Sequence, residues 1–164
     1  MEEGMNHLIS SKFYHRINPV GAVRQTQADR WKKRPSVLRY RAFAGELRMA
    51  AAAQNFVLGE RCIMIFQIQM ADSWSKKKKE LMNGKPHQQK PDWDNLAKSV
   101  GDILGVNQED SYIHTAFCAK FWAYEGSVRV YNIHQTVNSD LMSLVDTIES
   151  DLYSQSSSAL QKWF

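Results

Sequence analysis

Five carboxylates and one lysine lie within a short stretch of the sequence, and their spacing suggests metal-dependent chemistry. They are Asp92, Asp94, Lys98, Asp102, Glu109 and Asp110. Apolar residues at helical spacing predict a helix over 93–104. At about 100° per residue, Asp94, Lys98 and Asp102 then share the helix face that points away from the core.

The pair Asp92 and Asp94 is predicted to lie where an extended segment enters this helix. Pro91 favours extended backbone before it, and side chains two positions apart in extended backbone point the same way. A short turn after the helix then returns the chain to Asp110, at the start of a strand. Asp92, Asp94 and Asp110 would form a hard-oxygen site suited to Mg²⁺ or Mn²⁺, and no His or Cys stands among them to suggest zinc.

The same residues are compatible with two structural interpretations. In the first, an aspartate caps the helix and Asp94 pairs with Lys98 one turn later. In the second, the stretch is a calcium loop, but the EF-hand pattern fails because Leu96 occupies its third ligand position and Ala97 its glycine. The residues alone leave catalysis and capping both open.

The charge pattern favours a polyanionic partner. Between Lys12 and Arg41 there are nine Lys/Arg and one acid, and Lys76–Lys79 adds a run of four. A basic body around an acidic patch suits nucleic acid, although solvated surface charge would look the same. No signal peptide and no run of about 20 apolar residues is seen, so we expect no membrane partner and a cytoplasmic location with free thiols at Cys62 and Cys118.

The order of elements predicts an α+β fold with a single small mixed sheet packed with helices. Strands are predicted over 5–17 and 60–71, and strands over 111–123 and 127–136 are predicted to form a hairpin. Helices are predicted from a Ser36 cap to about Leu58, near Lys76–Met82, over 93–104, and from Asn138 or Ser139 onward. We expect one domain over 1–153, ordered strand-helix-strand-helix-hairpin-helix, and a flexible tail over 154–164.

The spacing of the acidic stretch resembles one known family. Asp92-x-Asp94-Asn95, then Lys98, then Asp102 and an acidic pair opening a strand, is similar to the RusA-like Holliday junction resolvases (crossover-junction endodeoxyribonucleases). The resemblance is strongest over 90–123 and looser over 17–70, where INPVGAVRQTQADRW is similar to the family's basic N-terminal loop. Glu109 stands where the family has Asp.

The resemblance implies a RusA-like fold and a Mg²⁺-dependent endonuclease, with Mn²⁺ able to substitute. Such an enzyme resolves branched DNA, the four-way junction, by paired phosphodiester hydrolysis in recombination and repair, and acts as a homodimer. Asp92, Asp94 and Asp110 would be the metal-binding catalytic carboxylates, with Lys98 an essential cation beside them. Basic residues assigned to DNA contacts are Arg24, Arg30, Lys32, Lys33, Arg34, Lys90 and Lys120.

Two other functions remain open at this point. One is a catalytically silent DNA-junction-binding protein, and the other is a metal-dependent phosphatase without a nucleic-acid substrate. A nicking assay on a plasmid-borne junction with and without the metal ion separates all three.

Overall fold

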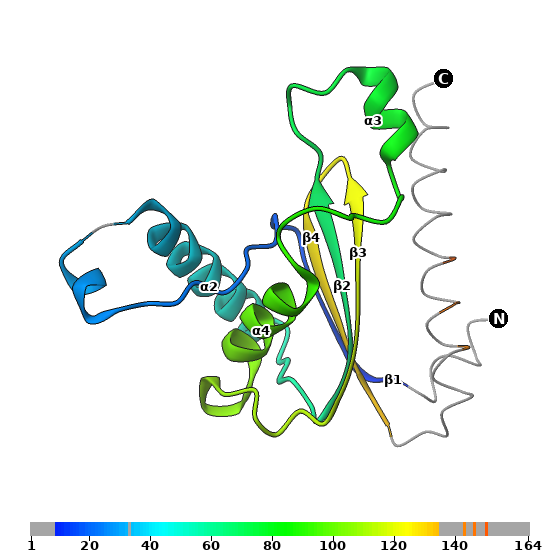
Figure 1. Cartoon of the computed structure of the whole chain (residues 1–164). Coiled ribbons are helices and arrows are strands. Elements are labelled where there is room, and N and C mark those ends of the chain that lie inside the picture. The colour runs from blue at the N-terminus through cyan, green and yellow to red at the C-terminus, as the bar shows by residue number, and fades with distance from the viewer. Residues whose placement is uncertain (1–8, 33, 135–142, 144–145, 147–149, 151–164) are drawn as a thin grey trace.

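A four-stranded mixed sheet forms the centre of the computed structural model, which describes residues 9–32, 34–134, 143, 146 and 150. The strands are β1 (Ile9–His15), β2 (Arg61–Gln69), β3 (Thr115–Ala123) and β4 (Ser127–Ile133), in the order β1-β4-β2-β3. The β2 and β3 strands are parallel, and β4 is antiparallel to both β1 and β2. This arrangement (Figure 1) confirms the predicted α+β class and mixed sheet.

The predicted hairpin of the last two strands is wrong. The β3 and β4 strands do not pair, because β2 lies between them. A gap of two strand spacings is about 10 Å, which the three residues 124–126 can span in extended form. A central position also explains β2 itself: Met64 and Phe66 are buried on one face, and Ile63 and Ile65 on the other.

Helix α2 (Pro35–Ala53) begins and ends earlier than predicted. Pro35 occupies the first helical turn and Arg34 is the N-cap, so Ser36 lies inside the helix. The helix stops before Asn55, whose φ of 50° is left-handed, a conformation that asparagine adopts more readily than most residues. Phe56 and Leu58 follow the helix as buried core residues in non-helical backbone.

The other two α-helices have the predicted positions. Helix α3 (Lys76–Met82) stands beyond one end of the sheet, and α4 (Trp93–Leu104) follows it. Two short 3₁₀ turns, η1 (Gln27–Arg30) and η2 (Val106–Gln108), complete the described elements. The predicted helix after Asn138 and the tail over 154–164 fall outside the residues that the structure describes, except for three isolated positions.

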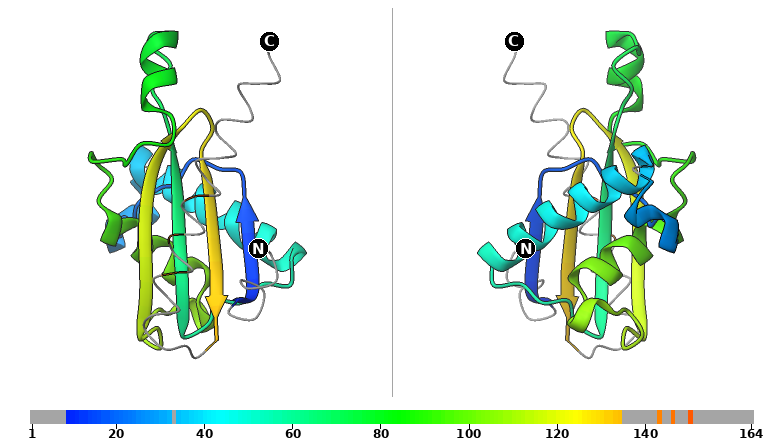
Figure 2. Two further views of the ribbon diagram at one scale, coloured as in Figure 1. Left: turned by 90° about the vertical axis from the view of Figure 1, so that its right-hand side faces the viewer. Right: turned by 90° about the vertical axis from the view of Figure 1, so that its left-hand side faces the viewer.

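Helices α2 and α4 cover the same face of the sheet (Figure 2). Phe43 and Leu47 of α2 and Leu96 and Val100 of α4 belong to one buried cluster with Met64 of β2. The opposite side of α4 is thereby left facing outward, as its sequence predicts. Cys62 is buried and Cys118 partly buried, and both are free thiols. No helix among the described residues has the length and apolarity needed to cross a bilayer.

Candidate active site

The acidic stretch begins at the N-terminus of α4. Asp92 is the N-cap residue, with extended backbone (φ −69°, ψ 151°), and Asp94 lies in the first turn. The side chain of Asp92 makes no capping hydrogen bond. Within the described residues neither carboxylate has a hydrogen-bond or ion-pair partner, so the capping interpretation loses its main support. The partial positive charge of the helix N-terminus favours carboxylates here without a specific bond.

A tight turn after α4 returns the chain to Asp110. Asn107 and Gln108 both adopt left-handed backbone, with φ of 54° and 61°. Two such residues in a row cost on the order of 1–2 kcal/mol each, and strained turns of this kind are common near functional sites. Gly101 permits the approach on the helix side, because a Cβ at this position would lie only 3.0 Å from Cβ of Asp110.

Lys98 joins the helix to the returning chain. Its Nζ lies 3.1 Å from Oδ1 of Asp102, one turn further along α4, and 3.1 Å from Oδ2 of Asp110. The hydrogen bonds that Lys98 donates to Asp102 and then to Asp110 raise its pKa above the usual value, so the ammonium stays charged. The Asp94–Lys98 pair of the capping interpretation is absent from the described structure, since Lys98 turns toward Asp102 and Asp110 instead.

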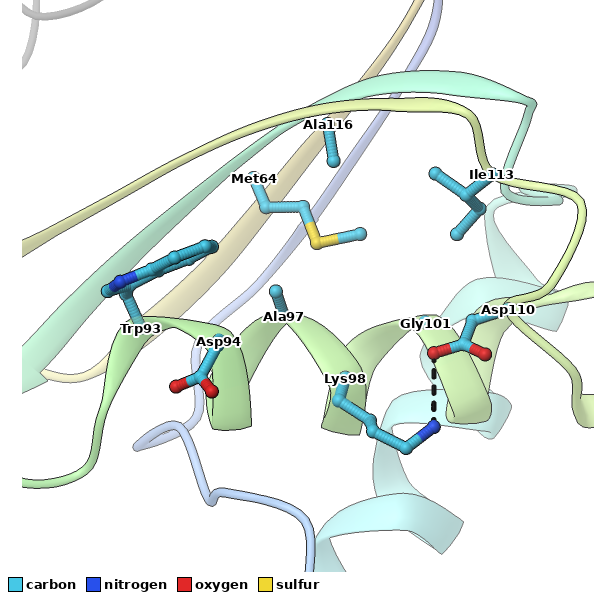
Figure 3. A pocket seen from close by; sticks show the side chains of 9 residues that line it. All are labelled: Met64, Trp93, Asp94, Ala97, Lys98, Gly101, Asp110, Ile113 and Ala116. Atoms are coloured by element: carbon cyan, nitrogen blue, oxygen red, sulfur yellow. Dashed lines mark hydrogen bonds and ion pairs between the residues drawn. The ribbon is translucent and has the colours of Figure 1, made fainter.

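A pocket of about 250 Å³ lies between α4 and the strands β2 and β3 (Figure 3). Asp94, Lys98 and Asp110 provide its charged lining, and Met64, Ile113 and Ala116 face them as apolar lining. The structure therefore brings three of the four predicted catalytic residues to one pocket. Asp92 is exposed and does not line it.

One pocket residue was missed by the sequence reasoning. Trp93 lines the pocket and is 59% exposed, a high value for so large an apolar side chain. Its position between Asp92 and Asp94 was the available signal, but helical spacing argued against it. At about 100° per residue, Trp93 falls near Val100 on the apolar side of α4, where a core residue is expected. Figure 3 shows it at the end of the pocket, next to Asp94.

The donor set fits Mg²⁺ in its chemistry. Carboxylate oxygens are the ligands that this hard cation prefers, and one or two of them usually suffice because Mg²⁺ keeps several waters. In the described part of the chain, no three His, Cys, Asp or Glu side chains lie close enough to form a metal-binding group. Asp94 and Asp110 share the pocket, whereas Asp92 stands outside it.

The basic loop between β1 and α2 carries most of the predicted DNA contacts. Some of these side chains are exposed to solvent, and one is bonded within the loop. Arg24, Arg30 and Lys32 are exposed, and Lys33 lies outside the described residues. Arg34 is engaged internally: its Nη2 lies 2.7 Å from Oδ2 of buried Asp29 and 3.0 Å from the Arg24 carbonyl. The Arg34 guanidinium holds the pKa of the Asp29 carboxyl well below its usual range.

The base of this loop is attached to α4 near the acidic residues. The amide of Ala22 donates to the carbonyl of Asn95, at 3.1 Å. A Cβ at Gly21 would lie 2.4 Å from Nδ2 of Asn95, so a larger residue there would have to displace the Asn95 side chain. The loop thus leaves the protein body beside Asp94, which places its exposed arginines and lysine on a chain anchored at the pocket's helix.

The last two predicted DNA contacts, Lys90 and Lys120, differ in exposure and in hydrogen bonding. Lys90 is exposed. Lys120 is partly buried, and its Nζ lies 2.6 Å from the carbonyl oxygens of both Gln89 and Pro91.

Comparison with known proteins identifies the class. The model of one family, described as Endodeoxyribonuclease RusA, matches residues 16–131. The chain therefore belongs to the RusA endodeoxyribonuclease family, and the matched region contains α4, the returning turn and all the residues of the pocket. A search of curated proteins and a search of solved structures each returned no match.

Proposed function

We propose that this nuclease resolves four-way DNA junctions by Mg²⁺-dependent phosphodiester hydrolysis. The observation that carries the proposal is the ion pair between Lys98 and Asp110, which joins a carboxylate from beyond the turn to the charged face of α4. Membership of the RusA endodeoxyribonuclease family supports the assignment of cleavage to this pocket, where carboxylates and a cation lie side by side.

Asp94 and Asp110, with Asp92 at the N-cap, would hold the metal ion. When bound, Mg²⁺ lowers the pKa of a coordinated water and polarises the phosphate. The Lys98 ammonium, kept charged by its acidic neighbours, offsets the negative charge that develops on the phosphate during cleavage. Asp102 holds Lys98 from the next turn of the helix and so keeps the ammonium at the pocket.

The exposed basic residues would bind the DNA backbone. Arg24, Arg30 and Lys32 on the loop, and Lys90 before α4, lie at the surface on segments that lead to the acidic residues. Contacts of this kind fix the position of DNA without reading its sequence. Attraction to phosphates is strongly salt-dependent because bound counterions are released.

Two chains would act together. A four-way junction has two-fold symmetry and needs two paired cuts, while each chain carries one pocket. A homodimer with a two-fold interface meets that requirement. Light scattering of the protein bound to junction DNA tests it: two chains per junction are expected, and one chain per junction would contradict the dimer.

The deciding experiment uses a plasmid with an extruded cruciform and the same plasmid relaxed, each incubated with Mg²⁺ or with chelator. Linear product is expected only from the cruciform plasmid and only in the presence of Mg²⁺. Equal cutting of both plasmids would leave a nuclease without junction preference. Binding without any cutting would favour the catalytically silent junction-binding protein.

A further inference from the structure

The segment before α4 lies along the outer edge of β3. The Gly84 amide donates to the Trp122 carbonyl, the Trp122 amide to the Lys85 carbonyl, and the His87 amide to the Lys120 carbonyl, at 2.8–2.9 Å. Pro86 and Phe121 form an antiparallel bridge in the same stretch. Since β3 is an edge strand, this pairing covers its outer backbone groups at Lys120 and Trp122 and leads the chain toward Asp92.

Lys120 projects from β3 on the face that α4 covers. By the strand period of two it shares this face with Cys118 and Trp122, both of which pack against the core of that side. Its ammonium donates to the carbonyls of Gln89 and Pro91, at 2.6 Å each. Hydrogen bonds from an ionised donor are roughly twice as strong as neutral ones, so two of the three donors of Lys120 are well occupied.

One of these two bonds is made to the residue that precedes the candidate metal ligand Asp92. The carbonyl of Pro91 belongs to the peptide that joins Pro91 to Asp92. On the other side, the carbonyl of Asp92 accepts the amide of Leu96 at 3.1 Å, the first bond of α4. The backbone of Asp92 is therefore held before and after its Cα, while its carboxylate has no partner within the described residues.

The neighbourhood of Lys120 supports an internal role for its charge. His87 is 3% exposed and packs against Trp122, with ring centroids 4.0 Å apart and the ring planes tilted by 50°. Burial and then the charge of Lys120 lower the pKa of His87, which keeps this ring neutral beside the ammonium. Only one of the three donors of the Lys120 ammonium lacks a partner among the described residues, which leaves little of this side chain for a phosphate.

We propose that Lys120 is a positioning residue for Asp92 and not a DNA contact. By clamping the Gln89 and Pro91 carbonyls it fixes the peptide from which the Asp92 carboxylate projects. The proposal rests on the proposed function in one respect, that Asp92 takes part in cleavage. A guanidinium also offers several donors to two carbonyls, so Lys120→Arg is expected to keep much of the clamp, and Lys120→Met to lose it.

The first test compares binding with cleavage on a labelled four-way junction. Lys120→Met should bind the junction without metal within about twofold of the wild type and with the same salt slope, because no phosphate contact is lost. Its single-turnover cleavage at saturating junction should fall about 100-fold, the size of effect that a misplaced group causes. Lys120→Arg should recover most of that loss. Lys85→Met, which removes an exposed charge from the segment that pairs with β3, should match the wild type.

A reduced salt slope with normal cleavage at saturation would overturn the proposal and make Lys120 a DNA contact. The second test does not depend on activity: amide hydrogen exchange at Leu96 should be about tenfold faster in Lys120→Met than in Lys85→Met, since first-turn bonds open locally. Equal exchange would overturn the clamp even if cleavage falls. If the wild type cuts no junction, the proposed function fails, yet this exchange measurement still decides the clamp.

Lys120→Gln is the second neutral variant in case Lys120→Met unfolds. It should show the same faster exchange at Leu96 with a retained thermal transition. Global unfolding of both neutral variants would contradict a local positioning role, because it would make Lys120 a general requirement of the fold.

Discussion

Nζ of Lys98 and Oδ2 of Asp110 lie 3.1 Å apart although the residues are twelve positions apart in the sequence. The contact crosses the pocket between α4 and the chain that returns from it. It joins the helix that carries Asp94 to the segment that carries Asp110.

Lys98→Ala should fold normally, bind junction DNA and cleave far more slowly. The side chain faces outward and Ala is a good helix residue, so the core is unaffected. Loss of one preorganised charge at the reacting phosphate costs on the order of 3 kcal/mol, roughly 100-fold in rate or more. Single-turnover cleavage measures this, with Lys85→Ala as the control. Cleavage near the wild-type rate would reduce Lys98 to a surface ion pair.

Gly101→Ala should slow cleavage without a matching loss of stability. A Cβ at 101 would meet Cβ of Asp110 at 3.0 Å, so Asp110 must shift from its place beside Lys98. The helix itself gains up to about 1 kcal/mol from Ala. Gly45→Ala is the matched control, because Gly45 lies in α2 with nothing within 4 Å of a new Cβ. It should raise the urea midpoint and leave cleavage unchanged. Equal cleavage by both variants would show that the approach of Asp110 to α4 is not needed.

Arg34→Gln should destabilise the protein, whereas Arg30→Gln should weaken DNA binding. Arg34 neutralises a buried carboxylate, Asp29, and an unpaired buried charge is unfavourable. Arg30 is exposed, so its loss should reduce the salt slope by about one. Urea unfolding and binding across a salt series measure the two effects.

Asp29→Asn added to Arg34→Gln should restore part of the lost stability, because it removes the unpaired carboxylate. An Arg34→Gln protein as stable as the wild type, with the reduced slope expected for Arg30→Gln, would instead place Arg34 on the DNA.

The protein should lose stability as the pH falls below about 6.5, in part through His87. Burial, and then the charge of Lys120, lower the pKa of His87 in the folded state. The unfolded chain therefore takes up this proton at higher pH than the folded protein does, and proton uptake favours unfolding. His87→Phe keeps a ring against Trp122 and should reduce the drop in urea midpoint between pH 7.5 and 5.5. His134→Gln, at an exposed histidine, should not, and an equal drop in all three proteins would remove His87 from the explanation.

Residues with a strong local pattern were predictable from the sequence. Leu96 and Val100, at helical spacing, predict the bounds of α4 and its buried side. The same spacing correctly places Asp94 and Lys98 on the side that faces outward. The return of Asp110 was also expected from the short turn after the helix. The extended backbone of Asp92 at the entrance to α4 was expected as well. The pattern did not show that its carboxylate would lie outside the pocket that Asp94 and Asp110 line.

Long-range pairing was beyond the sequence for a physical reason. The turn at Glu125-Gly126 indicates that two strands end close together, but not whether a third strand separates them. In the same way, a basic residue type indicates charge and not its partner. Arg34 and Lys120 look like DNA contacts in the sequence, yet one is bound to Asp29 and the other to two backbone carbonyls.

The most direct test of the proposed site measures junction binding and cleavage on Asp92→Asn, Asp94→Asn and Asp110→Asn, each with and without Mg²⁺. Asn keeps the shape of each side chain and removes one negative charge. If the three carboxylates hold the metal ion, each variant should nearly abolish Mg²⁺-dependent cleavage. Without metal, each should bind the junction as tightly as the wild type or more tightly, most visibly at low salt where screening is weak. Retained cleavage in any two of the variants would contradict the three-carboxylate site.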